Sequence, residues 1–337
     1  MFRDGLRSAL RSRLLLWILG VLCLPLTPSA ARAQTDLRLT EQEADSVAAT
    51  YDYIFPIWGK KVVERGFDIP YPFGVSANFL SQRFDVIIDD LQLSLGDAAL
   101  VPFDVVKFKS AGTKMITGNV RGDLWVLPFL NVSLMYGDGR GETSVALEEP
   151  VSFSTQVDFR GKYYGFGFLG AFGISRYFFT VDWSQTWFDS DIVKKPVLAN
   201  IGGLRAGRTF DVKGRNLSVW VGTMYQNYES ETVGTVTGED VFSGRLQEAL
   251  EGYEDTPWYQ DLGAKQKLLV DEIAEAVLAA DPSTVKINYS INKKPAQPQN
   301  LLIGSRFEFN KTWEARVEAG FIGREQLLAS VVYRWAW

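Results

Sequence analysis

The chain has 337 residues but contains no histidine and only one cysteine, Cys23. Without histidine it has neither the base of a Ser-His-Asp triad nor a His metal ligand, and a single cysteine cannot form an intramolecular disulfide. Paired-carboxylate chemistry is also unsupported, because Asp89 and Asp90 are neighbours in a predicted strand and point to opposite faces. We therefore expect no enzyme activity, no metal and no cofactor.

After residue 33 the chain also lacks any apolar run long enough for a transmembrane helix, which needs about 20 residues. The most apolar stretch, residues 163–174, has 12 residues, and five of them are Gly or Ala. A helical membrane protein is therefore excluded.

Residues 1–33 have the three-part layout of a secretory signal peptide. Four arginines precede an apolar stretch at 14–26, and Ala31-Arg32-Ala33 forms an A-x-A cleavage site before Gln34. Retention of this segment as an N-terminal anchor is the alternative. Cleavage removes five Arg, one Asp and Cys23, which changes the net charge from −5 to −9. Such an acidic chain is not expected to bind nucleic acid.

The rest of the chain shows period-2 alternation over segments of about ten residues, the length of a tilted transmembrane strand. On the last segment one face carries Leu327, Ala329, Val331, Tyr333, Trp335 and Trp337. The same alternation recurs at 116–126, 177–187, 301–309 and 313–321. A soluble sandwich would concentrate its aromatic residues inward, whereas here they gather at strand ends, as in the aromatic girdles of a membrane barrel.

These features together resemble Gram-negative outer-membrane β-barrel proteins. The resemblance covers residues 74–337 and implies export to the cell outer membrane, with outer-membrane lipid and lipopolysaccharide as surroundings. It further implies that Tyr333, Trp335 and Trp337 belong to a C-terminal signal that the barrel-assembly machinery reads.

The predicted fold is all-β, a transmembrane antiparallel β-barrel of about 10–12 strands with a partly helical extracellular loop. Short turns near 128, 173–176, 211–215 and 310–311 fall on one side of the membrane. Longer connections at 95–112, 138–161, 188–197 and 229–298 fall on the other side, which is the asymmetry typical of such barrels. This scheme gives ten strands, and a hairpin of 143–147 with 151–159 would make twelve.

Two segments are not expected to form barrel strands. Residues 34–73, a periplasmic segment or a lumen plug, begin with a predicted helix at 40–49. In the extracellular insertion 229–298, apolar residues recur at helical spacing: Phe242, Leu246 and Leu250, then Leu269, Ile273, Val277 and Ala280. These helices either pack on each other as a loop cap or form a lid over the barrel mouth.

Charged residues also fall on the predicted lumen face. They are Arg121, Arg205, Arg306, Arg316 and Arg334, with Asp123, Asp182, Glu308, Glu314 and Glu318. Because a barrel of this size is narrow, five charges of each sign predict either a structural network of ion pairs or a narrow, gated passage.

Two functions follow from these expectations. The first is a narrow channel or transport pore for small or amphipathic solutes, gated by 229–298. The second is a closed structural or surface-interaction barrel that acts through its extracellular loops, without transport or catalysis.

Overall fold

The computed structural model describes residues 41–49, 51–103, 107–149, 154–191, 193, 195–228, 231–237, 252–279 and 282–337. The predicted signal peptide, with Ala31, Ala33 and Gln34, lies outside these residues. The helices are α2 (Glu41–Ala49), α3 (Gly59–Val63), α6 (Pro257–Gln260) and α7 (Ala264–Ala279), with 3-10 turns η2 (Tyr253–Asp255) and η3 (Pro282–Thr284). None of these helices is long and apolar enough to cross a membrane.

Thirteen strands account for most of the described chain. They are β1 (Phe73–Leu95), β2 (Val101–Pro102), β3 (Lys107–Leu127), β4 (Leu130–Glu149), β5 (Ser154–Ile174), β6 (Tyr177–Ser190), β7 (Val197–Asp211), β8 (Asn216–Tyr228), β9 (Glu231–Thr237), β10 (Lys286–Pro295), β11 (Gln299–Glu308), β12 (Trp313–Phe321) and β13 (Arg324–Trp335).

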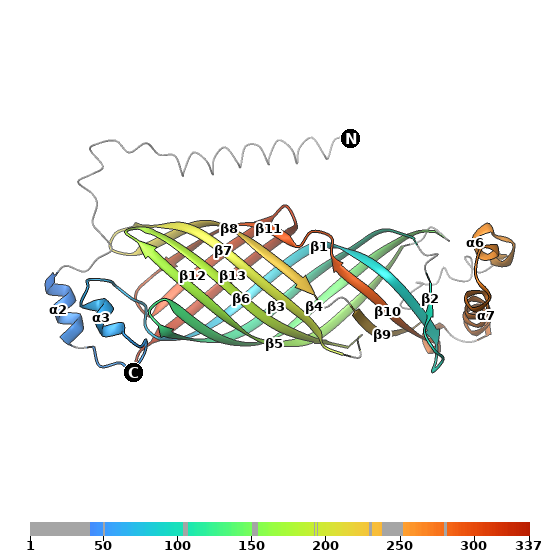
Figure 1. Cartoon of the computed structure of the whole chain (residues 1–337), viewed down its shortest axis with the longest axis horizontal. Helices are drawn as coiled ribbons and strands as arrows, with labels where there is room; N and C mark the ends of the chain where they lie inside the picture. Colours follow the sequence, from blue (N-terminus) through green and yellow to red (C-terminus); the bar gives the residue numbers. More distant parts are fainter. Residues whose placement is uncertain are drawn as a thin grey trace, which may run out of the picture.

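Ten of these strands close into an antiparallel barrel in the order β1-β3-β4-β5-β6-β7-β8-β11-β12-β13. The ring closes where β13 returns to β1, with a register that runs from Phe73 opposite Trp335 to Phe84 opposite Arg324. The first and the last strand segments of the barrel, the start of β1 and the end of β13, lie at the same mouth, which we call the terminal end (Figure 1). We call the opposite mouth the loop end. The predicted transmembrane barrel is confirmed.

The structure also decides the strand count. Residues 143–147 continue β4, and residues 154–159 continue β5, so they form no extra hairpin and the count of twelve is wrong. The connection between these strands is therefore confined to 150–153 rather than 138–161. Alternation in short windows could not separate one long strand from two, because both have the same period. The turns near 128, 175, 213 and 310 lie at the terminal end, as predicted.

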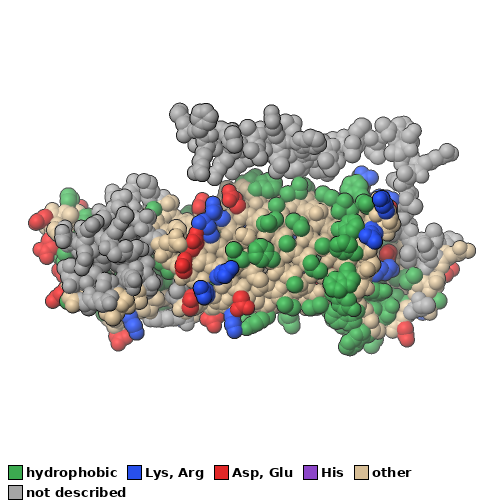
Figure 2. All heavy atoms as spheres, turned by 180° about the vertical axis from the view of Figure 1, so that it is seen from behind, with side chains coloured by type: hydrophobic (Ala, Val, Ile, Leu, Met, Phe, Trp, Pro, Cys, Tyr) green, Lys and Arg blue, Asp and Glu red, His purple; other side chains and the backbone are tan. Residues whose placement is uncertain are grey.

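The outer wall is apolar because alternate side chains point away from the lumen. On β4, Leu134 is 71% exposed, whereas the inward Asn131 is 2% exposed. Figure 2 shows hydrophobic side chains over the middle of this wall, with charged side chains gathered on both sides of it. An apolar band bounded by charge is the surface that a lipid bilayer covers.

The barrel is much taller on one side than on the other. The strand β1 has 23 residues and β3 has 21, whereas β12 has nine. The strand β13 pairs with β1 only as far as Phe84. Beyond this residue the partner of β1 is β10, and β10 in turn pairs with β9. A single bridge between Val193 and Gly234 then joins β9 to the connection that follows β6. The hairpin of β9 and β10 thereby extends the sheet past the shorter strands.

The helical part of the insertion packs on this extension. Leu269, Val270 and Ala274 of α7 form an apolar cluster with Phe103 and with leucines of β1. The helix predicted from Leu269, Ile273 and Val277 is thus confirmed, whereas the one predicted from Phe242, Leu246 and Leu250 lies outside the described residues. In Figure 1, α6 and α7 lie beyond the loop end, next to β2.

The N-terminal segment lies against the terminal end (Figure 1). Its predicted helix is confirmed as α2. Lys311, in the β11–β12 turn, forms an ion pair of 2.8 Å with Asp68, and the Ile57 amide donates to the Val126 carbonyl at 2.9 Å. These contacts hold the N-terminal segment against the barrel at its terminal end.

Candidate functional site

A network of charged side chains crosses the middle of the lumen. The guanidinium of Arg205 on β7 donates to both Glu318 oxygens on β12, at 2.7 and 3.0 Å, and also pairs with Asp182 on β6. Because β8 and β11 separate β7 from β12, these side chains meet only across the interior. Glu318 is 1% exposed, so the network is enclosed by the barrel.

Glu318 holds two further groups in place. Arg316 pairs with it at 2.8 Å, and the Trp220 indole donates to it at 2.7 Å. The guanidinium of Arg316 also lies 5.1 Å from the Trp220 ring centre. Trp220 was not among the residues expected in the lumen, although alternation along β8 places it on the face opposite Val219 and Val221. One buried carboxylate therefore has three donors around it, which offsets much of its desolvation cost.

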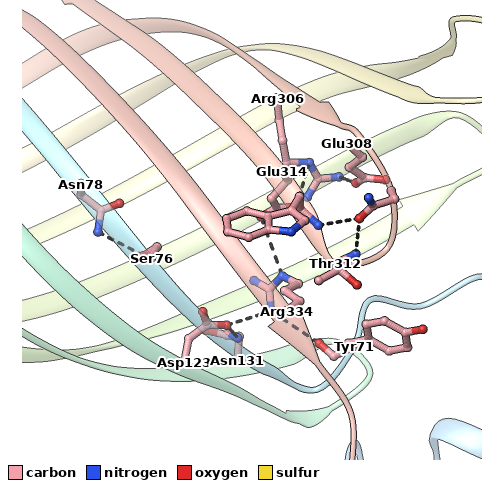
Figure 3. A network of polar contacts seen from close by, with 12 residues as sticks. Tyr71, Ser76, Asn78, Asp123, Asn131, Arg306, Glu308, Thr312, Glu314 and Arg334 are labelled. Atoms are coloured by element: carbon pink, nitrogen blue, oxygen red, sulfur yellow. Dashed lines mark hydrogen bonds and ion pairs between the residues drawn. The ribbon is translucent and has the colours of Figure 1, made fainter.

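A second network lies nearer the terminal end (Figure 3). Arg334 on β13 pairs with Asp123 on β3 at 3.1 Å and with Glu314 on β12 at 3.8 Å. Asn131 donates to Asp123 at 2.5 Å, and Arg306 pairs with Glu308 at 2.6 Å and with Glu314 at 3.9 Å. Arg334 also donates to the Tyr71 carbonyl at 3.5 Å, so the N-terminal segment reaches this network.

The structure thus brings nine of the ten predicted charges into two groups. Around Glu318 lie Asp182, Arg205 and Arg316, and around Arg334 lie Asp123, Arg306, Glu308 and Glu314. The tenth, Arg121, forms no ion pair within the described residues, and its charged neighbours come from both groups: Asp123, Asp182, Arg316 and Arg334. All five carboxylates are therefore paired.

The remaining inward positions are mostly small or polar. Ser133, Ser218 and Thr117 are 5%, 1% and 4% exposed, and Asn300 is 1% exposed. Glycines also face the lumen, and a side chain at Gly304 would overlap the Trp220 indole. A polar interior with alternating apolar exterior is the pattern of an outer-membrane barrel. No cluster of metal-ligating side chains occurs among the described residues.

The C-terminal aromatic residues lie on the outer face at the terminal end. The Trp335 ring stacks on Phe73 at 5.9 Å and on Tyr333 at 5.8 Å. Trp337 is 82% exposed, with its ring centre 5.6 Å from that of Phe73. These rings therefore surround the seam where the barrel closes.

A groove of about 780 Å³ lies on the outer wall over β3–β6, towards the loop end. Its lining includes the bases Arg140, Arg160 and Lys162 and also the acids Asp138, Asp189 and Asp191. Along these strands the groove directly follows an aromatic cluster in which Tyr164 stacks on Trp187 at 5.7 Å. Aromatic residues mark the membrane interface in barrels, so these charged residues lie at the height of lipid headgroups.

No protein-family model and no curated protein matches the chain. Similar solved structures include the β-domain of the Bordetella autotransporter BrkA, with a TM-score of 0.38 and 9% identity, over 78% of this chain and 100% of that chain. The translocator domain of autotransporter NalP from Neisseria meningitidis has a TM-score of 0.34 and 14% identity, over 87% of this chain and 98% of that chain.

An outer-membrane channel from Pseudomonas putida F1 has a TM-score of 0.31 and 6% identity, over 79% of this chain and 96% of that chain. All three are Gram-negative outer-membrane β-barrels, the class that the sequence resembles. At these levels the similarity concerns the fold alone, and the barrel architecture itself follows from the strand pairing of this chain.

Proposed function

We propose that the protein is an outer-membrane channel for small solutes whose lumen is closed at rest by the Glu318 network. The observation that carries this proposal is the charge inside the barrel. Buried ion pairs seldom stabilise a protein more than apolar residues of similar volume. A barrel that served only as a scaffold would be filled at lower cost by apolar side chains, so the charges are better explained as the lining of a hydrated path.

The width of the barrel supports the closed resting state. Barrels of about eight strands are filled by side chains, whereas open channels are typical of about sixteen. With ten strands, a bridge such as Arg205 to Glu318 spans much of the lumen. Solute passage therefore requires these side chains to separate, and the network itself acts as the gate.

The insertion is a second candidate gate, because α7 packs on the sheet extension at the loop end. The test is single-channel conductance of the refolded chain 34–337, compared with a variant in which an Asn-Gly turn replaces 238–285. Since Thr237 pairs with Lys286, this replacement keeps the hairpin of β9 and β10. If only the shortened variant conducts, the insertion acts as a lid. If the two proteins have equal conductance, the insertion is not the gate, and the gate lies in the lumen.

The alternative function is a closed barrel that acts through its loops, without transport or catalysis. It is favoured by the pairing of all five lumen carboxylates and by the apolar cluster of α7. It predicts no conductance in the intact chain, in the shortened chain or in Glu318→Gln. That triple result would exclude the channel proposal.

The proposal includes lipopolysaccharide as a partner of the outer groove. Arg140, Arg160 and Lys162 offer cations, interspersed with Asp138, Asp189 and Asp191, where anionic headgroups of the outer leaflet would lie. Replacing the three by Gln should weaken binding of lipopolysaccharide to the refolded barrel. The matched control replaces Arg208, Lys213 and Arg215 at the terminal end, where binding should be unaffected. An equal loss of lipopolysaccharide binding in both variants would show that net charge alone accounts for the effect.

The C-terminal signal is proposed to act during assembly. Because Trp337 is largely exposed, its deletion should lower the amount of barrel inserted in cells by the barrel-assembly machinery. The same deletion should leave refolding in detergent nearly unchanged. A parallel loss in both settings would instead assign Trp337 a structural role.

A further inference from the structure

The charges in the lumen are distributed unevenly between its two mouths. Towards the terminal end the arginines other than Arg121 are paired with carboxylates, as described above. At the loop end the inward positions carry two cations, Arg324 on β13 and Lys293 on β10. Within the described residues, neither has a carboxylate among its charged neighbours. Among the described residues, the inward charges at the loop-end mouth are therefore positive and have no carboxylate as counterion.

Arg324 is held firmly in this position. Its backbone amide donates to the Asn300 side-chain oxygen at 3.1 Å, and its guanidinium lies 5.6 Å from the centre of the Phe84 ring. The side chain is only 2% exposed. Among the described residues its one titratable neighbour is the Tyr228 hydroxyl, which contacts the guanidinium, and the ring centres of Tyr228 and Phe84 lie 5.9 Å apart. An aromatic pair thus lies beside an enclosed cation.

Several hydrogen-bond donors at this cation have no partner among the described residues. Apart from a contact with the Tyr228 hydroxyl, the guanidinium nitrogens of Arg324 have no hydrogen-bond partner within the described part of the chain, and neither has the amide nitrogen of Asn300. Arg205, in the same lumen, has bonds to two carboxylates. Burying an unpaired charge is costly, whereas pairing it with a planar oxyanion forms two parallel, charge-assisted bonds. The Arg324 site therefore has donors for an anion that none of the described carboxylates supplies.

We propose that Arg324 and Asn300 form a binding site for the carboxylate of a small organic solute that enters from the loop end. The fork of the guanidinium matches the two carboxylate oxygens, and Phe84 and Tyr228 provide an apolar wall for the body of the solute. Lys293, which is paired with Ile88 four residues beyond Phe84 along β1, lies about 13 Å further out. It draws anions towards Arg324. As the assignment of a solute class, the inference rests on the proposed channel function.

The test is calorimetric titration of sodium benzoate into the refolded chain 34–337 in detergent. Saturable binding is expected, with at least a tenfold loss of affinity in Arg324→Gln and a smaller loss in Arg324→Lys, which keeps the charge but not the fork. Arg83→Gln is the matched control, because Arg83 is exposed on the outer face beside Phe84. Neutral benzamide should not bind. Equal affinities in Arg324→Gln and Arg83→Gln would overturn the site.

Inorganic phosphate and acetate serve as competitors, because both offer oxyanions to the same donors. Acetate displacing benzoate at lower concentration than phosphate supports a carboxylate solute. The reverse order would overturn that assignment in favour of a phosphoryl group.

Stability separates a binding residue from a structural one. Because the unpaired guanidinium is costly in the empty barrel, Arg324→Gln should leave the thermal midpoint unchanged or raise it. A clear fall would make Arg324 a structural cation and overturn the proposal. Conductance is recorded separately with and without benzoate. Benzoate binding without conductance in any variant would reject the channel and keep the site, whereas conductance without binding would reject the site alone.

Discussion

Arg205 on β7 and Glu318 on β12 are joined by two hydrogen bonds, although β8 and β11 lie between their strands. The two side chains therefore reach each other only through the lumen. This bridge links strands that are three places apart in the ten-strand ring and occupies part of the lumen between them. We therefore expect changes at this one carboxylate to affect both the stability and the permeability of the barrel.

Replacing Glu318 with Gln removes the negative charge that three donors share. Arg316 loses its ion pair, and Arg205 keeps only Asp182. The free energy of unfolding in urea should fall by about 3 kcal/mol, and single-channel conductance should rise because the bridge is weakened.

The control for this change is Glu325→Gln, which removes the same charge from an exposed position on β13. Its effect on stability should remain within about 0.5 kcal/mol. If Glu318→Gln unfolds at the same urea concentration as the unaltered chain and shows no conductance, the network neither closes the lumen nor stabilises the barrel.

The close approach of Gly304 to Trp220 gives a second prediction. A methyl group at Gly304 would overlap the indole and displace it from Glu318. Gly304→Ala should therefore lower the unfolding free energy by about 1–3 kcal/mol. Gly118→Ala is the control, since its added methyl group meets no atom within 4 Å. Similar effects of the two substitutions in urea unfolding would contradict the packing described here.

The third prediction distinguishes the lipid-facing wall from other exposed apolar surface. Leu134 on β4 is 71% exposed and Leu268 on α7 is 60% exposed. In a bilayer Leu134→Arg should lower stability by about 2–4 kcal/mol, because it places a charge in hydrocarbon. Leu268→Arg, on the insertion, should change the stability of the protein little. Unfolding in lipid vesicles measures both, and equal effects would argue against a membrane belt at Leu134.

The fourth prediction concerns pH. Tyr253 and Tyr259 donate to the same Asp271 oxygen at 2.9 and 2.8 Å. The bond to Asp271, with added desolvation, raises the pKa of Tyr259 to about 12 from 10.0. Burial, followed by the bond to Asp271, raises the pKa of Tyr253 in the same direction.

Both tyrosines bind their protons more tightly in the folded state, so their contribution to stability is complete below about pH 10. It is lost as the pH rises through the folded-state pKa of about 12 for Tyr259. Tyrosinate absorbance should therefore appear at lower pH in Asp271→Asn than in the unaltered chain. Asp261→Asn, at an exposed position, should leave the titration unchanged. A titration that is identical in all three proteins would refute the shared bond.

Much of the barrel could be predicted because strand alternation is a local property. The exposure of Leu301 at 43% and of Leu302 at 2% follows directly from their opposite faces. The lengths of the long strands β4 and β5 were harder to predict, because a window of ten residues does not reveal where a strand ends. The helix α7 was visible in its apolar spacing, but its packing partner Phe103 was not, since they are far apart in the chain.

The sequence by itself determined which residues face lipid and which face the lumen, because period 2 fixes the face of every residue in a strand. It also determined the absence of histidine chemistry. Only the tertiary structure decided which charges meet, because Arg205 and Glu318 are 113 residues apart and their contact depends on the register of four strands. For the same reason, only the closed barrel showed that Arg334 has two carboxylate partners while Arg324 has none among the described residues.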